Sequence, residues 1–174
     1  NSLHDIIEKT SKKIYIPITV GGGLRTIEDI SSVLRCGADK VAINTEAVNN
    51  KSFIKQSVEK FGSSTIVIEI QIKKQLNGNY VAFTDNGRNN SGLDVFEWAK
   101  CVESLGVGEL LITSIDRDGT GLGFDINIID EISKNVKIPV IASGGASKNE
   151  DIISLCNKTN IDGVALASML HYPL

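Results

Sequence analysis

One pattern occurs twice in the sequence, and this internal repeat limits the possible folds more than any other feature. An apolar run, a glycine turn and the triplet Glu-Asp-Ile follow one another in residues 18–30, and the same order returns in residues 140–152. The match continues from residues 39–45 to residues 162–168, so the copies span about 18–45 and 140–168. Each copy contains two strand–helix units, which is typical of a protein built from two related half-barrels.

The rest of the chain shows the same alternation of short apolar, β-branched runs with longer segments of helical period. Strands are expected at 16–20, 40–44, 65–71, 110–115, 139–142 and 163–167. Helices are expected at 2–13, 26–36, 51–61, 94–105, 126–134 and 149–156. Such alternation predicts a parallel sheet covered by helices in a single domain, residues 1–174. A doubly wound sheet would also fit the alternation, but the repeat favours a (β/α)₈ barrel.

Residues 72–84 interrupt this alternation. Asn77-Gly78 lies there between alternating residues, which predicts a β-hairpin inserted after the third strand. The simplest interpretation of the hairpin is decoration of the barrel.

The composition excludes several classes of function. A net charge of −3 gives no electrostatic footprint for nucleic acid or an anionic membrane, and no apolar run approaches the roughly 20 residues of a membrane span. The three cysteines are scattered without a CxxC spacing, which argues against disulfides and structural zinc and suits a reducing cytoplasm. No ligand set for a metal or another cofactor is visible, so none is expected.

The glycine turns of the two copies predict two phosphate sites. Glycine at the end of a strand lets the backbone approach an anion, and the N-terminus of the next helix offers unpaired N–H groups. In a barrel, such a turn acts together with the end of the next strand. One site therefore combines Gly22 and Gly23 with Asn44 and Thr45; the other combines Gly144 and Gly145 with Ala167 and Ser168. Two sites across one barrel mouth imply a long substrate with a phosphate at each end, unless the glycines only form tight turns.

Four segments resemble the cyclase subunit of imidazole glycerol phosphate synthase. They are Pro17–Gly23, Gly37–Thr45, Gly108–Thr120 and Ile141–Ala146, and the similarity covers nearly the whole chain in the right order. The resemblance implies a (β/α)₈ barrel in which the visible strands are the third to the eighth. The first two strands and most of the last helix are then missing, so the sequence, which starts at Asn1, is expected to be a fragment or the ordered part of a longer chain.

By the same resemblance, the protein is a cyclase (lyase) of histidine biosynthesis in a heterodimer with a glutaminase. Ammonia from the glutaminase passes through the barrel centre and attacks a ribulosyl intermediate that carries a phosphate at each end. The products are imidazole glycerol phosphate and an aminoimidazole carboxamide ribotide.

The resemblance also assigns residues. Gly22, Gly23, Asn44 and Thr45 match one phosphate site, and Asp118, Gly119, Gly144, Gly145, Ala167 and Ser168 match the other or its surroundings. Thr113 and Ser143 lie at the mouth, where Thr113 and Asp118 are candidates for catalysis. Lys40 and Glu109 match charged residues that ring the ammonia entrance, and Asp39 matches a residue that faces the glutaminase. Two plainer interpretations remain: Lys40 and Glu109 form only an ion pair, and residues 116–118 form a solvated loop.

One position departs from the family. The reaction is thought to need two aspartates, and Gln71 stands in place of the second. An amide orients a substrate by hydrogen bonds but does not exchange protons at neutral pH. Glu69 lies on the same face of its strand, about 6–7 Å deeper. The hypothesis is that Glu69 pairs with Lys40 and rebuilds the ammonia gate.

Two other functions stay open. One is a paralogue that docks a glutaminase and passes ammonia onward without cyclising, as for the amidino sugars of surface glycans. It would explain an altered active site together with unaltered charged residues at the ammonia entrance. The related isomerase of the histidine pathway would also need a carboxylate at Gln71, and Glu109 and the hairpin favour the cyclase over it.

Overall fold

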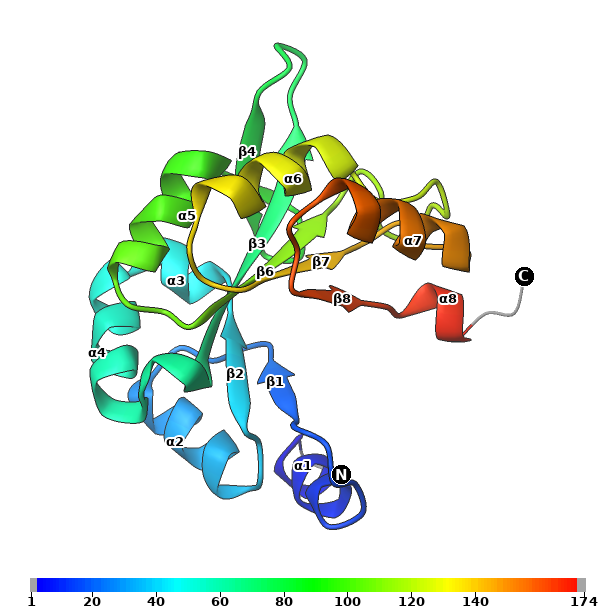
Figure 1. Ribbon diagram of the computed structural model, residues 1–174. Helices are drawn as coiled ribbons and strands as arrows, with labels where there is room; N and C mark the ends of the chain where they lie inside the picture. Colours follow the sequence, from blue (N-terminus) through cyan, green and yellow to red (C-terminus); the bar gives the residue numbers. More distant parts are fainter. Residues whose placement is uncertain (1–2, 172–174) are drawn as a thin grey trace.

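The computed structural model describes residues 3–171, and its centre is one curled, largely parallel sheet (Figure 1). Six parallel strands follow one another in the order β1-β2-β3-β6-β7-β8, and β4 and β5 extend the sheet antiparallel to β3. The parallel strands are β1 Thr19–Gly21, β2 Lys40–Ile43, β3 Ile66–Lys74, β6 Glu109–Ser114, β7 Val140–Ser143 and β8 Gly163–Ala165. The antiparallel strands are β4 Tyr80–Thr84 and β5 Asn89–Asp94.

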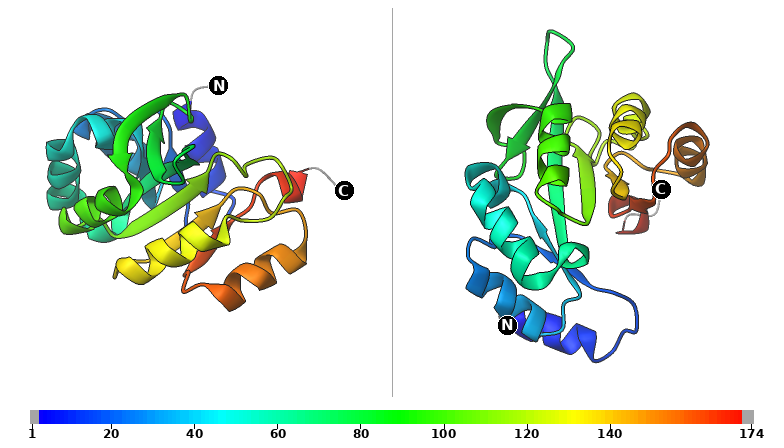
Figure 2. Two further views of the ribbon diagram at one scale, coloured as in Figure 1. Left: turned by 90° about the horizontal axis from the view of Figure 1, so that it is seen from above. Right: turned by 60° about the vertical axis from the view of Figure 1, so that its left-hand side comes forward.

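Helix α1 precedes the first strand, the other helices follow β1, β2, β5, β6, β7 and β8, and the longer helices cover the convex side of the sheet, as the views in Figures 1 and 2 show. The helices are α1 Leu3–Ser11, α2 Ile27–Arg35, α3 Thr45–Asn49, α4 Lys51–Phe61, α5 Val95–Ser104, α6 Ile126–Asn135, α7 Asn149–Lys158 and α8 Ser168–His171. A doubly wound sheet would carry helices on both faces, so this arrangement agrees with a barrel-like (β/α) fold. The outer edges of β1 and β8 pair with no further strand within residues 3–171.

The core fills the space between the sheet and the helices. In β3, Ile66, Ile68, Ile70 and Ile72 are almost fully buried there, and Trp98 of α5 is buried with them. Because strand residues alternate between faces, the intervening residues point to the concave side. That side carries Ala42, Glu69, Leu111, Thr113 and Ser143, all only partly buried. The strand periodicity thus separates an apolar outer layer from an inner face that carries functional groups.

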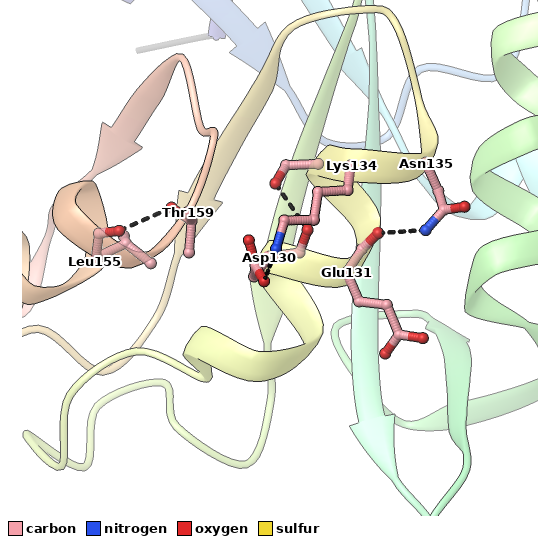
Figure 3. A network of polar contacts seen from close by, with 7 residues as sticks. Asp130, Glu131, Lys134, Asn135, Leu155 and Thr159 are labelled. Carbon is pink, nitrogen blue, oxygen red and sulfur yellow. Dashed lines mark hydrogen bonds and ion pairs between the residues drawn. The ribbon is translucent and has the colours of Figure 1, made fainter.

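Side chains complete the hydrogen bonding where α6 and α7 end (Figure 3). Asn135 donates Nδ2–H to the Glu131 carbonyl at 2.8 Å, and Thr159 donates its hydroxyl to the Leu155 carbonyl at 2.8 Å. Leu155 is one of the last four residues of α7, whose carbonyls have no amide partner within the helix, so the bond from Thr159 satisfies one of them. Lys134 and Asp130 add an ion pair at 2.6 Å one turn apart.

The expected strands and helices are present with shifted ends. β1 begins at Thr19 because Pro17 has no N–H and the Ile18 N–H donates to Asp39 instead of to a strand. β3 runs on to Lys74 and turns through Gly78 (φ 89°) into β4, with which it pairs antiparallel. Two helices, α3 and α8, and strand β5 were not expected. Of the expected helix 2–13, residue 2 lies outside the described residues.

Two further findings concern the whole described chain. No helix within residues 3–171 is both long and apolar enough to cross a bilayer. Cys36, Cys101 and Cys156 are all free thiols.

Candidate active site

Two pockets lie at the carboxyl ends of the parallel strands. The larger of the two lies at the ends of β1, β2 and β3 and has a volume of about 500 Å³. Segments after three strands and the β4–β5 turn form its wall. It is lined by Gly22, Gly23, Leu24, Arg25, Ala42, Ile43, Asn44, Thr45, Glu46, Asn49, Glu69, Gln71, Asp85 and Asn86. The structure therefore brings all four residues of the first expected phosphate site together with Glu69 and Gln71.

Gly22 and Gly23 form a turn that is open to this cavity. Their φ angles are 106° and 73°, where a side chain would be strained, and a Cβ at either position would meet nothing within 4 Å. The glycines are needed for the backbone path, and the space above them is free for a ligand.

Asp29 and Thr26 form a capping box at the N-terminus of α2. Asp29 accepts the N–H groups of Arg25 and Thr26 at 3.0 and 2.9 Å, and Thr26 accepts the Asp29 N–H at 3.1 Å. The bond from the Arg25 N–H, followed by the two bonds with Thr26, lowers the pKa of Asp29. Arg25 and Thr26 precede the first residue of α2, and their N–H groups are bonded to Asp29 rather than free for phosphate.

Asp151 occupies the corresponding place before α7. It accepts the N–H groups of Ser147 and Lys148 at 2.9 and 3.1 Å, and the Ser147 hydroxyl at 3.1 Å. The bond from the Ser147 N–H is the main reason why the pKa of Asp151 is lowered. Both copies of the internal repeat have a glycine turn followed by Glu-Asp-Ile, and in both the aspartate of this triplet caps the helix.

Asn44 and Thr45 hold the end of β2 against its neighbours. Asn44 donates Nδ2–H to the carbonyls of Glu69 and Phe83, both at 3.2 Å, and the Thr45 hydroxyl accepts the Asp85 N–H at 3.1 Å. Asp85 and Asn86 have φ angles of 52° and 57°. These two residues of the cavity wall were missed, although the order Asp85-Asn86-Gly87 is a recognisable turn signal.

A smaller pocket of about 200 Å³ lies at the carboxyl ends of β6, β7 and β8. It is lined by Gly119, Thr120, Gly121, Ala146, Ser147, Ser168 and Met169. Only Gly119 and Ser168 of the second expected phosphate site are among them. Because all parallel strands point the same way, both pockets open on the same edge of the sheet.

Gly144 and Gly145 have a packing role that their counterparts lack. A Cβ on Gly145 would lie 2.3 Å from the Gly123 carbonyl oxygen, and one on Gly144 would lie 2.9 Å from the Ser114 oxygen. Gly123 also donates its N–H to the Gly145 carbonyl at 2.8 Å. The loop after β6 therefore covers these glycines, whereas the space above Gly22 and Gly23 is open.

Glu69 contacts Gln71 and Thr113 on the concave face. Gln71 donates Nε2–H and Thr113 donates its hydroxyl to the same Glu69 oxygen, Oε1, each at 3.2 Å. Ser143 is the neighbour of Thr113 in β7. The hypothesis that Glu69 pairs with Lys40 is wrong, because the Lys40 ammonium forms its ion pair with Glu109. A glutamate side chain is long enough to reach toward the strand's carboxyl end, and it finds two donors there.

Lys40 and Glu109 are the first residues of β2 and β6, at the end of the sheet opposite the cavity. Their ion pair is partly buried. Beside it, Asp39 accepts the Ile18 N–H at 2.7 Å, and Asp162 accepts the Val140 N–H at 2.9 Å in the second repeat copy. Asp39 therefore ties two strands together within this chain.

The loop after β6 is held by the hairpin. Asp116 accepts the Lys74 N–H at 2.9 Å, and Tyr80 donates its hydroxyl to Asp125 at 2.7 Å. Asp118, a candidate for catalysis, is exposed on this loop, and Ala167 is exposed before α8. The hairpin thus fixes the loop that covers Gly144 and Gly145, which is more than decoration.

Among residues 3–171, no group of three or more His, Cys, Asp or Glu side chains is arranged to hold a metal ion. The side chain of His4 in α1 shares a 3.0 Å hydrogen bond with Ser32 of α2.

Comparison with known proteins gives a consistent picture. The family model described as "Histidine biosynthesis protein" matches residues 1–173. The chain is 46% identical over 168 residues to "Imidazole glycerol phosphate synthase subunit HisF" of Bacillus cereus (strain AH187), covering 97% of this chain and 67% of the relative. It is 48% identical over 170 residues to the protein of the same name from Saccharolobus solfataricus, covering 98% of this chain and 67% of the relative.

Proposed function

The chain belongs to the family of histidine biosynthesis proteins, and on that premise we propose that it acts as the cyclase (lyase) subunit of imidazole glycerol phosphate synthase. In this role it takes ammonia from a glutaminase partner in the cytoplasm. The ammonia attacks a ribulosyl intermediate that carries a phosphate at each end. Ring closure and cleavage give imidazole glycerol phosphate and an aminoimidazole carboxamide ribotide.

The observation that carries the proposal is the pair of pockets on one edge of the sheet. The larger holds the open turn Gly22-Gly23, and the smaller holds Gly119 beside Ser168. A substrate with two phosphates would place one at each pocket and its reacting carbon between them. Thr113 and Ser143 are neighbours on β6 and β7 and would face that carbon.

In the same proposal, the opposite end of the sheet receives ammonia. Lys40 and Glu109 form the charged ring at the entrance, and Asp39 faces the glutaminase. The six parallel strands correspond to the third to the eighth of a (β/α)₈ barrel, and two more strands complete it. The coverage of 67% of the relatives' length is consistent with this plan.

Gln71 favours a second candidate function, that of a paralogue that docks a glutaminase and conducts ammonia without cyclising. An amide at this position removes a proton-transfer group from the site. The ion pair of Lys40 and Glu109 would still serve a conduit.

Turnover of the ribulosyl bisphosphate by the full-length protein, with an ammonium salt as the nitrogen source, tests the proposal. Formation of imidazole glycerol phosphate supports the cyclase. No product with ammonium salt, together with stimulation of a bound glutaminase, would instead support the conduit.

A further inference from the structure

The carboxylate of Glu69 lies closer to the carboxyl end of the sheet than the Glu69 backbone does. In the pairing of β3 with β6, Glu69 is opposite Leu111, and Gln71 is opposite Thr113. The Glu69 oxygen Oε1 nevertheless accepts hydrogen bonds from the side chains of the next pair on this face, Gln71 and Thr113. The longer side chain thus brings a carboxylate to the level of residue 71, on the wall of the larger cavity.

This carboxylate is held differently from the acids that stabilise the fold. Asp29, Asp39, Asp151 and Asp162 all accept backbone N–H groups at strand or helix ends. Glu69 accepts only from two neutral side chains and is in none of the ion pairs within residues 3–171. Glu69 is partly buried, lines the cavity and accepts from neutral donors through only one of its two oxygens, so the other oxygen is left for a ligand in the cavity.

We propose that Glu69 is the general acid–base residue of the cavity and supplies the carboxylate that Gln71 lacks. The inference rests on the proposed cyclase function. As ammonia forms its C–N bond to the substrate carbonyl carbon, Glu69 takes a proton from the nitrogen. It then gives this proton to the carbonyl oxygen, which becomes a hydroxyl group. Glu69 next takes a second proton from the nitrogen and delivers it to this hydroxyl, so that the C–O bond breaks, water leaves and the nitrogen lone pair forms the C=N bond of an imine. Glu69 ends the sequence in the protonation state in which it began.

Gln71 acts as a positioning residue for both protonation states of Glu69. With Glu69 ionised, the Gln71 amide donates Nε2–H to it, as observed. The Gln71 oxygen Oε1 is buried and has no hydrogen-bond partner among the described residues. When Glu69 is protonated, a half-turn of the amide lets this oxygen accept the Glu69 O–H. Gln71 is 8% exposed, so the amide stays beside the carboxyl group in either state.

Glutamine also avoids a conflict that the family's aspartate would create. An aspartate at residue 71 would place two carboxylates side by side, and one of them would hold its proton to higher pH. The other charged groups that face this cavity are Arg25, Glu46 and Asp85. Lys40 and Glu109 neutralise each other at the far end of the strands. Glu69 and Gln71 together therefore provide one acid–base group where Asp and Glu would compete.

The test uses the full-length protein and ammonium-dependent turnover measured across pH. Glu69→Gln is expected to lower kcat about 10²–10⁴-fold with little change in KM, because shape is kept and proton transfer is lost. The acid limb of the pH profile should disappear as well. The exposed Glu59→Gln, on the outer surface of α4, serves as the matched control and should leave kcat unchanged.

Further variants separate proton transfer from folding. Added formate should partly restore turnover in Glu69→Ala, because a free carboxylate can occupy the vacated space. Gln71→Asp should not exceed the wild type, and its acid limb should move to higher pH. Inorganic phosphate should bind Glu69→Gln as it binds the wild type, which shows that the cavity is intact.

The outcomes are distinguishable. Wild-type turnover that survives in Glu69→Gln within about threefold, or that rises in Gln71→Asp, overturns the role of Glu69 and leaves the cyclase function standing. A wild type without turnover overturns the cyclase function and the role of Glu69 together.

Discussion

Asp29 and Asp151 occupy the same place in the two copies of the internal repeat, and each accepts two backbone N–H groups just before its own helix. The acid is therefore part of the junction between glycine turn and helix. Asp39 and Asp162 form a second such pair at the other ends of the strands. Both copies keep these supports even where their cavities differ.

Replacing Asp151 with Ala should lower the melting temperature by about 2–4 °C, because the cap of α7 is lost. The pKa of Asp151 is lower in the folded protein than the value of 3.8 of a free side chain. Its contribution is thus present above pH 4 and is lost as pH falls through the folded pKa. Thermal unfolding of both proteins from neutral to acidic pH should show two curves that converge at low pH.

Glu150→Ala is the control for this prediction. Glu150 is exposed in the first turn of α7 but makes no cap bond among the described residues. Its loss should shift the melting temperature by less than half as much. Equal effects of the two substitutions would mean that general charge, and not the cap, stabilises the helix.

The two glycine turns should differ in their tolerance of a side chain. Gly145→Ala combines a φ of 103° with a contact of 2.3 Å to a backbone oxygen, so it should cost about 2–5 kcal/mol of unfolding free energy. Gly23→Ala has only the strain of φ 73° and should cost about 1–2 kcal/mol. Urea unfolding of both variants measures the difference, and equal costs would contradict the packing role of Gly145.

Much of this arrangement could be predicted from the sequence. The repeat placed Gly22, Gly23, Asn44 and Thr45 together, and the period of two placed Glu69 and Gln71 on one face; in the structure the first four line one cavity, and Gln71 donates a hydrogen bond to Glu69. The occupied start of α2 also had a signal, because Thr26 and Asp29 have the spacing of a capping box.

Other features could not be predicted, because they depend on contacts between distant segments. Strand period gives the face of Glu69 but not the reach of its side chain to Thr113. Burial of Gly145 under Gly123 depends on how the loop after β6 folds back. Strand β5 begins with Asn89, Asn90 and Ser91, polar residues that are typical of a loop, and is a strand only because β4 offers it an edge.

Tyr80→Phe should loosen the loop after β6 at a cost of about 0.5–1.5 kcal/mol, the value of one hydrogen bond. Burial, and then the bond to Asp125, raises the pKa of Tyr80. The bond therefore stabilises the fold fully below the pKa of an unfolded tyrosine and is lost as pH rises through the folded value. Ultraviolet titration should show a late-ionising phenol that is absent from Tyr80→Phe. Tyr15→Phe, which alters a 99% exposed side chain, should retain it.

Lys40 and Glu109 should respond to substitution as a pair. Lys40→Met leaves the Glu109 carboxylate, with its side chain only 13% exposed, without its cation, which should cost about 1–3 kcal/mol. Adding Glu109→Met should recover most of that cost, whereas Lys55→Met, in an exposed pair at 3.9 Å, should cost less than about 1 kcal/mol. If this pair rings the ammonia entrance, Lys40→Met should reduce glutamine-dependent turnover in the glutaminase complex more than turnover with ammonium salt. Equal losses in the two assays would assign the pair to stability alone.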